Sequence, residues 1–283
     1  MTTIGSVLHH VTQRLDTAGI ENARFEARLL LCHVLQVETQ VVIGYPERVV
    51  CAQDLTRLED LLTRRERREP MSHIMGEREF WSLPFKVTKD TLTPRPDSET
   101  LIEAVLRHIP DQKRDMQVLD LGVGTGCLLL SILSEYPMAQ GLGIDISPAA
   151  LQVARENAKC LGLDERSVFQ EGNWADGLSQ KFDLILSNPP YIPSGEKDVL
   201  EPEVAQFEPD SALYGGPDGL DDYRKLADAL PGVMDVDSLA VLEIGINQAY
   251  DVTKLMEIAG LRVLETPKDL SGIERCAIIR KKL

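Results

Sequence analysis

From Thr100 onward, short apolar runs alternate with helix-like segments, and this alternation restricts the chain to few folds. The four clearest runs are Val118–Leu121, Gly141–Asp145, Phe182–Leu186 and Leu239–Ile244. Strands that recur between helices pair in parallel, because each helix carries the chain back to the same end of the sheet. The pattern predicts an α/β domain with a mostly parallel, doubly wound sheet. Near the C-terminus, Leu261–Leu264 and Cys276–Ile279 flank a longer turn and predict an antiparallel pair.

The first 75 residues have a different, helical periodicity. Ile4, Val7, Val11 and Leu15 fall on one helical face, and two further helices are expected, one after Asn22 and one ending before Pro70. The basic run Arg64–Arg68 is interpreted as the solvated face of the last helix in preference to a phosphate site. We therefore expect a helical domain over 1–75, a hairpin linker over 76–95 and the α/β domain over 96–283.

Composition restricts the partners. The 283 residues include 30 basic and 45 acidic side chains, a formal net charge of −15, which argues against direct binding of nucleic acid or an anionic membrane. The five cysteines are scattered without a Cys-x-x-Cys pair, so no metal is expected and a reducing compartment fits best. No leader and no apolar run of about 18 residues is visible, which favours a cytoplasmic protein.

A glycine-rich turn follows the first apolar run of the α/β part. The stretch from Asp120 to Gly126 reads Asp-Leu-Gly-Val-Gly-Thr-Gly and opens a helix. Missing side chains let the backbone approach a ligand at the carboxyl end of a strand, although a tight turn needs glycine in any case. A dinucleotide fingerprint would place its third glycine at Cys127, so the spacing favours a turn that binds a methyl donor.

Two further residues are expected beside that ligand. Asp145 ends the next apolar run, where its carboxylate can accept both hydroxyl groups of a ribose, although it could simply cap the helix that starts at Pro148. Trp174 follows the third strand, where an indole can pack along an adenine ring or merely fill the core.

The most specific motif is Asn188-Pro189-Pro190-Tyr191, directly after the run Phe182–Leu186. The two prolines fix φ and remove two amide donors, so the loop is stiff. The Asn188 side-chain carbonyl and the Pro189 backbone carbonyl can together accept both hydrogens of one –NH₂ group. Tyr191 is expected to form a wall of the acceptor pocket. A merely stiff turn is the alternative.

This geometry selects a planar amino or amide nitrogen as methyl acceptor. Such a nitrogen is a poor nucleophile because its lone pair is delocalised, and holding both hydrogens favours localisation of that pair towards an incoming methyl group. Alignment and electrostatics next to an electrophilic sulfonium then carry the reaction, without a strong general base.

Beyond this loop, the chain resembles the protein-(glutamine-N5) methyltransferases that modify peptide chain release factors, the PrmC or HemK family. The resemblance rests on motifs from about position 70 to nearly the C-terminus: Gly76 with Phe80 and Phe85, Arg95–Glu99, Asp120–Gly126, Asp145, Asn188–Tyr191, Glu208-Pro209 with Ala212-Leu213, Gly216–Gly219, Glu243–Gly245 with Gln248, and Asp269 through Gly272 to Arg275. The chain departs from the family pattern at Ser98, where threonine is usual, and at Thr93, where an aliphatic residue is common.

The resemblance implies a Rossmann-like, seven-stranded methyltransferase domain behind a small helical bundle, with S-adenosylmethionine as methyl donor. It implies class-I release factors as partners and the glutamine of their Gly-Gly-Gln motif as acceptor. The donor would be bound by Gly122, Val123, Gly124, Thr125, Gly126, Asp145, Trp174 and Asn188. Asn188, Pro189 and Tyr191 would serve catalysis, and Asn188, Pro189, Pro190 and Tyr191 would bind the substrate.

Two other functions share part of this pattern. A nucleic-acid adenine-N6 or cytosine-N4 amino methyltransferase faces the same acceptor chemistry, but needs a cationic groove that an acidic chain with one basic run does not suggest. A non-catalytic donor-binding protein would have no need of a clamp for the acceptor nitrogen. An acidic enzyme that receives a large partner protein is expected to be a monomer.

Overall fold

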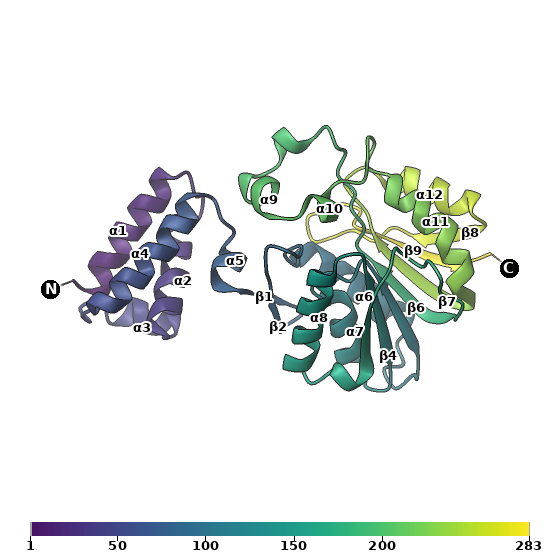
Figure 1. Cartoon of the computed structure of the whole chain (residues 1–283), viewed down its shortest axis with the longest axis horizontal. Helices are drawn as coiled ribbons and strands as arrows, with labels where there is room; N and C mark the ends of the chain where they lie inside the picture. The colour runs from purple at the N-terminus through teal and green to yellow at the C-terminus, as the bar shows by residue number, and fades with distance from the viewer. Residues whose placement is uncertain (1, 283) are drawn as a thin grey trace. The chain divides into compact units, whose positions relative to one another are not determined.

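The computed structural model describes residues 2–282, and contacts between residues group the chain into two compact units. The first unit comprises Met1–Gly76 together with Glu201–Phe207, and the second comprises Glu77–Leu200 together with Glu208–Leu283. Figure 1 traces the chain through both units by colour. The expected linker hairpin is thus grouped with the second unit, and a short segment from the second half of the sequence is grouped with the first.

The first unit is helical, as its periodicity predicts. Its helices are α1 (Ile4–Thr17), α2 (Ala23–Leu35), α3 (Thr39–Gly44), α4 (Ala52–Glu66), α5 (Met71–Met75) and α9 (Pro202–Phe207). Val7, Val11 and Leu15 of α1 pack with Leu30 of α2 and Leu62 of α4 in one apolar core. A capping box at Thr3 and Ser6 starts α1, whereas Asn22 stands at the start of α2 without a side-chain capping bond.

The basic run at the end of α4 corrects one sequence-based interpretation. Arg65 is 5% exposed rather than solvated, and its guanidinium contacts Glu26 at 2.6 Å and Glu203 at 2.9 Å. Arg68 contacts the other Glu203 oxygen at 2.9 Å. Arg64 pairs with the nearby Glu69, but Glu26 and Glu203 lie far from Arg65 and Arg68 in the sequence, so local pattern could not reveal these contacts. Together these ion pairs tie α9 to the end of α4 within the first unit.

The second unit begins with the hairpin and continues as an α/β domain. Its strands are β1 (Glu77–Phe80), β2 (Leu83–Lys86), β3 (Gln117–Leu121), β4 (Gln140–Asp145), β5 (Ser167–Glu171), β6 (Phe182–Ser187), β7 (Met234–Glu243), β8 (Leu261–Glu265) and β9 (Cys276–Lys281). Its helices are η1 (Pro96–Ser98), α6 (Glu99–His108), α7 (Cys127–Glu135), α8 (Pro148–Cys160), η2 (Asp164–Arg166), η3 (Lys197–Val199), α10 (Asp210–Leu213), α11 (Asp221–Val233) and α12 (Ala249–Ile258). β1 and β2 pair antiparallel, which confirms the hairpin.

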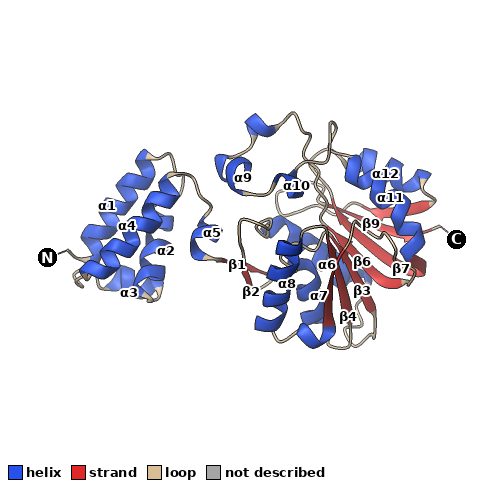
Figure 2. Cartoon of the chain, viewed as in Figure 1, coloured by secondary structure: helices blue, strands red, loops and turns tan. Residues whose placement is uncertain are grey.

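The main sheet has seven strands in the order β5-β4-β3-β6-β7-β9-β8. Strands β3 to β7 pair in parallel, and β9 runs antiparallel between β7 and β8. The predicted fold class is confirmed, including its antiparallel C-terminal strand. Figure 2 shows the strands fanned between helices, with α6, α7 and α8 on one side and α11 and α12 on the other.

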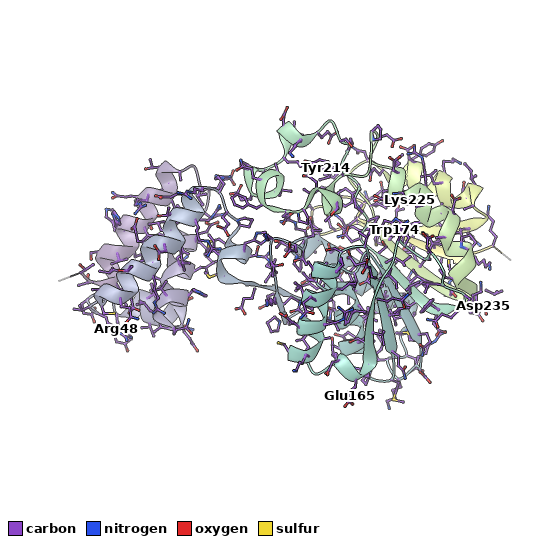
Figure 3. All side chains as sticks on the ribbon, viewed as in Figure 1. Arg48, Glu165, Trp174, Tyr214, Lys225 and Asp235 are labelled. Atoms are coloured by element: carbon purple, nitrogen blue, oxygen red, sulfur yellow. The ribbon has the colours of Figure 1, made fainter. Side chains whose placement is uncertain are left out.

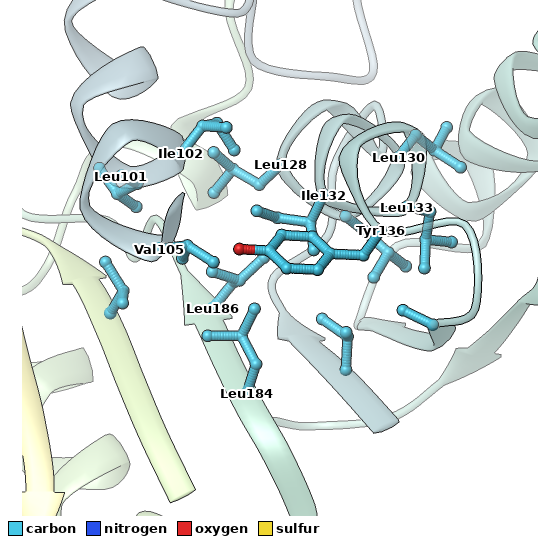
Figure 4. Packing of buried hydrophobic residues seen from close by; sticks show 14 of the residues in the cluster. Leu101, Ile102, Val105, Leu128, Leu130, Ile132, Leu133, Tyr136, Leu184 and Leu186 are labelled. Atoms are coloured by element: carbon cyan, nitrogen blue, oxygen red, sulfur yellow. The ribbon is translucent and has the colours of Figure 1, made fainter. Parts of the chain in front are cut away.

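Each face of the sheet is covered by its own apolar cluster. On one face, Tyr136 is fully buried among leucines of α7 and β6 in the packing shown in Figure 4. Its hydroxyl donates to the Ile109 carbonyl at 2.6 Å, so the only polar atom of the ring is satisfied. On the opposite face, Leu226 of α11 and Val252 of α12 pack against Leu119 and Ile185 of the sheet.

The order of the strands fixes where a ligand can bind. The chain winds outward from β3 through β4 to β5, then returns to pair β6 with the other side of β3. In open α/β sheets the crevice at the carboxyl ends of such a pair is the usual ligand site. Gly122 leaves β3 and Asn188 leaves β6 at this point. The fold thus brings the two strongest sequence motifs to one edge of the sheet.

Candidate active site

A cavity of about 350 Å³ lies at the carboxyl ends of the central strands, entirely within the second unit. Such a volume is typical of small-molecule sites. The residues that follow successive strands line it: Gly122–Thr125 after β3, Asp145–Ser147 from the end of β4, Gly172–Trp174 after β5, and Asn188 and Pro190 after β6. Trp174, Tyr214 and Lys225, all labelled in Figure 3, are also on its wall.

The glycine turn is held against the end of β4. The amides of Gly122 and Val123 both donate to the Ile144 carbonyl at 2.9 Å, and Gly122, Gly124 and Gly126 all have positive φ. A side chain is strained in this left-handed region, which explains why the turn needs glycine at these three positions. The turn is therefore rigid, and its backbone lies open to the cavity.

Gly122 lies next to the Trp174 ring, and both residues line that cavity. A Cβ atom at position 122 would stand 3.7 Å from the Trp174 ring, and Trp174 itself has a φ of 52°. The indole packs against the apolar cluster on one face of the sheet while also lining the cavity. Trp174 thus serves core packing and also offers an aromatic surface to a ligand.

Asp145 combines two arrangements that the sequence had left as alternatives. One carboxylate oxygen accepts from the Ser147 amide at 2.9 Å, next to the start of α8, and the other accepts from the Gly124 amide at 2.9 Å. Burial raises the pKa of Asp145, and the backbone amides only partly offset this. The carboxylate ties the glycine turn to β4 and still lines the cavity.

Asn188 lines the cavity. Among residues 2–282, no hydrogen bond engages its carboxamide. The preceding Ser187 hydroxyl donates to the Leu121 carbonyl at 2.6 Å, which pins the end of β6 to β3. A fixed backbone carrying an uncommitted amide is the arrangement expected of a group that binds a ligand.

Three predicted site residues do not line this cavity. Gly126 precedes α7, and a Cβ atom there would stand 3.1 Å from the Leu130 side chain. Pro189 is buried and does not line the cavity. The Tyr191 hydroxyl donates to a Glu243 carboxylate oxygen at 3.4 Å, away from the cavity lining.

The backbone around Tyr191 is tightly enclosed. The Gln248 side-chain amide donates to the Tyr191 carbonyl at 3.0 Å, and its carbonyl accepts from the Gly245 amide at 3.0 Å. Gly219 lies against the Tyr191 carbonyl, where a Cβ atom would stand only 2.3 Å from the oxygen. These contacts give a physical reason for Gly219, Gly245 and Gln248, which the sequence offered only as family signatures.

Sequence reasoning missed several residues of this site. Lys225 and Asp222 of α11 line the cavity and pair at 2.8 Å, but their spacing is that of any exposed helical ion pair. Ser98 of η1 also lines it. Glu243 could have been found from the sequence, because an acidic residue directly follows the apolar run that starts at Leu239. In the structure it is 1% exposed.

Comparison with known proteins agrees with this architecture. A family model described as a methyltransferase domain matches residues 112–216, and one described as the PrmC N-terminal domain matches residues 6–76. A parallel sheet that gathers a glycine turn, an acidic residue and an Asn-Pro-Pro-Tyr loop around one cavity is of the methyltransferase class. The chain is thus a methyltransferase with a helical N-terminal unit.

Curated relatives narrow this class over nearly the whole length. The chain is 47% identical to a release factor glutamine methyltransferase of Rhodospirillum rubrum over 279 residues, which is 99% of this chain and 85% of that protein. It is 45% identical to one of Caulobacter vibrioides over 266 residues, 94% of this chain and 92% of that protein. The chain belongs to the release factor glutamine methyltransferase family.

Solved structures agree on the fold. The ribosomal protein L11 methylase of Lactobacillus delbrueckii subsp. bulgaricus superposes with a TM-score of 0.51 at 17% identity, over 68% of this chain and 82% of that one.

Within residues 2–282 no helix has the length and apolar character needed to cross a membrane. In the same residues, His, Cys, Asp and Glu form no group of three or more that could hold a metal ion.

Proposed function

We propose that this chain transfers the methyl group of S-adenosylmethionine to the side-chain amide nitrogen of the glutamine in the Gly-Gly-Gln motif of class-I release factors. Membership of the family supports the substrate class. The observation that carries the chemistry is the uncommitted Asn188 amide on the wall of the cavity that also contains the glycine turn. Acceptor and donor groups can therefore meet in one site.

The residues present fit the methyl donor. The open backbone of Gly122–Gly124 leaves room that a side chain would fill, and the Trp174 ring offers a flat surface for an adenine. Asp145 supplies carboxylate oxygens for ribose hydroxyls. The donor, when bound, supplies an electrophilic methyl carbon on a sulfonium. We assign Gly122, Val123, Gly124, Thr125, Asp145, Trp174 and Asn188 to donor binding, with Gly126 shaping the turn from behind.

On the acceptor side, Asn188 and its loop orient the glutamine amide. The Asn188 side-chain carbonyl accepts one amide hydrogen, and the Pro189 carbonyl is the second acceptor in this proposal. Pro190 forms the part of the cavity wall next to the glutamine amide, and Tyr191 holds the Asn188–Tyr191 loop in place through its contact with Glu243. Alignment of a weak nucleophile with the methyl group is the main catalytic contribution, and intramolecular alignment of this kind is worth several orders of magnitude in rate.

The remaining assignments complete the proposal. The helical segment 1–75 recognises the body of the release factor, and the chain acts as a cytoplasmic monomer without direct contact to nucleic acid or membrane. The formal net charge of −15 supports this choice of partner, because a flipped base would require a cationic groove for its backbone.

One competition experiment tests which macromolecule is the acceptor. The protein is incubated with isotopically labelled S-adenosylmethionine and equal amounts of a class-I release factor and duplex DNA, and label is counted in each. We expect label in the release factor at close to one methyl group per molecule. Label in DNA with none in the release factor would overturn the proposal in favour of a nucleic-acid amino methyltransferase.

A further inference from the structure

Glu243 is a buried carboxylate that the proposed reaction does not use. It is the last residue of β7 and is 1% exposed. A carboxylate loses its hydration when it is buried, so a fold retains one there at a considerable cost unless it binds other groups. What Glu243 binds therefore indicates its role.

The Glu243 carboxylate links two segments beside the cavity. One oxygen accepts from the Ser98 hydroxyl at 2.5 Å, and the other accepts from the Tyr191 hydroxyl at 3.4 Å. Ser98 lines the cavity, and Tyr191 is the last residue of the loop that begins with Asn188. One side chain thus joins the η1 segment to the loop Asn188–Tyr191, called the acceptor loop below.

The backbone of Glu243 is itself fixed. The Tyr223 hydroxyl donates to the Glu243 carbonyl at 2.9 Å, and the next amide, of Ile244, donates to the Arg275 carbonyl at 2.8 Å. Glu243 is also paired in register with Cys276 of β9. The carboxylate is therefore mounted on a rigid strand, and the two hydroxyl groups are the parts that it can orient.

We propose that Glu243 is a positioning residue for methyl transfer, whose carboxylate holds the Tyr191 ring and the Ser98 segment where the acceptor amide can lie against Asn188. This inference rests on the proposed function. Glu243 acts through its two hydroxyl partners and does not itself touch the substrate.

The charge of Glu243 should then affect turnover. Burial raises the pKa of Glu243 to about 7, although the Ser98 hydroxyl lowers it in part. An ionised carboxylate accepts from both hydroxyl groups, whereas a protonated one carries a hydrogen that competes with one of them. Turnover should therefore rise with pH through the pKa of Glu243.

Other charged and titratable groups face Glu243 from every element packed against it. They are Asp97 of η1, Cys127 of α7, Tyr191 after β6, Tyr223 of α11, and Arg275 and Cys276 at the start of β9. Burial raises the pKa of both cysteines to about 12 and raises the pKa of both phenols, so these four groups stay neutral in the assay. Arg275 stays charged and contacts Asp269 at 2.9 Å.

Glu243→Gln tests the proposal because it keeps the shape of the side chain and removes the charge. We expect kcat/KM for the release factor to fall at least about 10-fold at about pH 8, while the Kd for S-adenosylmethionine changes less than about two-fold. The rise in turnover between about pH 6 and about pH 8.5 should disappear. Glu265→Gln, at the exposed end of β8, is the matched control and should keep both rate and pH profile.

Ser98 provides a second test that does not depend on the stability of the Glu243 variant. Ser98→Ala removes a hydrogen bond that favours the charged carboxylate, so the midpoint of the pH profile should move to higher pH. Ser98→Thr keeps the hydroxyl and should keep the midpoint. Burial also raises the pKa of Asp120 to about 7, and Asp120→Asn should leave the rise in place.

The outcomes separate this inference from the proposed function. If the wild-type protein does not methylate the release factor, the proposed function fails. If it does, but Glu243→Gln retains the wild-type rate and pH profile, Glu243 has no positioning role. Loss of the rise in Asp120→Asn, or an unmoved midpoint in Ser98→Ala, would equally overturn the assignment.

Discussion

Gly215 lies directly against the carbonyl group of Pro190, where a Cβ atom at position 215 would stand 2.5 Å from the carbonyl oxygen. The Gly215 amide also donates to the Ile192 carbonyl at 3.0 Å. The acceptor loop thus packs against a residue that has no space for a side chain. The position of the Asn188–Tyr191 loop thus depends on a residue about 25 positions further along the chain, which follows α9 and α10 in the sequence.

Gly215→Ala should therefore displace the acceptor loop. Because the clash is with backbone, the loop has to move, and overpacking of this kind costs about 1–3 kcal/mol. We expect methyl transfer to fall at least about 10-fold and the melting temperature to drop by several degrees. Gly195→Ala is the control, since nothing lies within 4 Å of a Cβ atom there. Equal activity of the two variants would contradict this role for Gly215.

Asn188→Ala should separate transfer from donor binding. The change removes the amide that receives the acceptor but leaves the glycine turn, Asp145 and Trp174 in place. Turnover should fall by about 10²-fold or more, while calorimetry finds the affinity for S-adenosylmethionine within about five-fold of the wild type. Wild-type turnover together with normal affinity would show that the assignment of Asn188 is wrong.

Donor binding should be visible in the fluorescence of one tryptophan. The chain has two, Trp81 and Trp174, and the Trp81 indole donates to Glu135 at 2.7 Å, outside the cavity. An adenine packed on the Trp174 ring should change its emission. Titration of Trp81→Phe with S-adenosylhomocysteine should retain the change, and titration of Trp174→Phe should lose it. If the fluorescence change is lost in Trp81→Phe and retained in Trp174→Phe, the assignment of Trp174 to the donor site is wrong.

Titration of Asp120 should make the free energy of unfolding depend on pH. Its carboxylate is buried without a well-aligned hydrogen-bond partner among residues 2–282, and burial raises its pKa from 3.8 to about 7, with the Leu129 amide offsetting only part of the effect. The folded state therefore favours the protonated acid. Its stabilising contribution is present below about pH 4 and is lost as pH rises through about 7.

Asp120→Asn removes this titration. The free energy of unfolding of the variant, relative to wild type, should increase between about pH 5 and about pH 8, by about 1–3 kcal/mol, since one pKa unit corresponds to about 1.4 kcal/mol. Urea denaturation of both proteins across this range measures the difference. A difference that stays constant with pH would mean that Asp120 is ionised throughout.

Local pattern predicted the parts of this protein that depend on neighbours in sequence. The apolar runs predicted β3, β4, β6 and β7, and parallel strands must end at the same edge, so Gly122, Asp145 and Asn188 were expected together. α8 starts at Pro148 as expected, but its cap is Ser147, whose hydroxyl accepts from the Ala150 amide at 3.2 Å, where Asp145 had been the candidate. The short helix α3 escaped prediction because it buries only Val42.

Relationships between distant residues could not be predicted in this way. Nothing in the two C-terminal apolar runs indicated that β9 would insert between β7 and β8. Arg65 appeared solvated because Glu203, one of its partners, is 138 residues away. Tyr191 was expected to form a pocket wall, and only the fold revealed the buried carboxylate of Glu243 beneath it.

The most direct test of the central claim is to locate the transferred methyl group within the release factor. A class-I release factor is incubated with this protein and S-adenosylmethionine, digested, and sequenced by tandem mass spectrometry. We predict one added methyl group on the glutamine side chain of the Gly-Gly-Gln peptide, and none when that glutamine is replaced by glutamate. Methylation at another residue, or an unmodified Gly-Gly-Gln peptide after complete reaction conditions, would contradict the account.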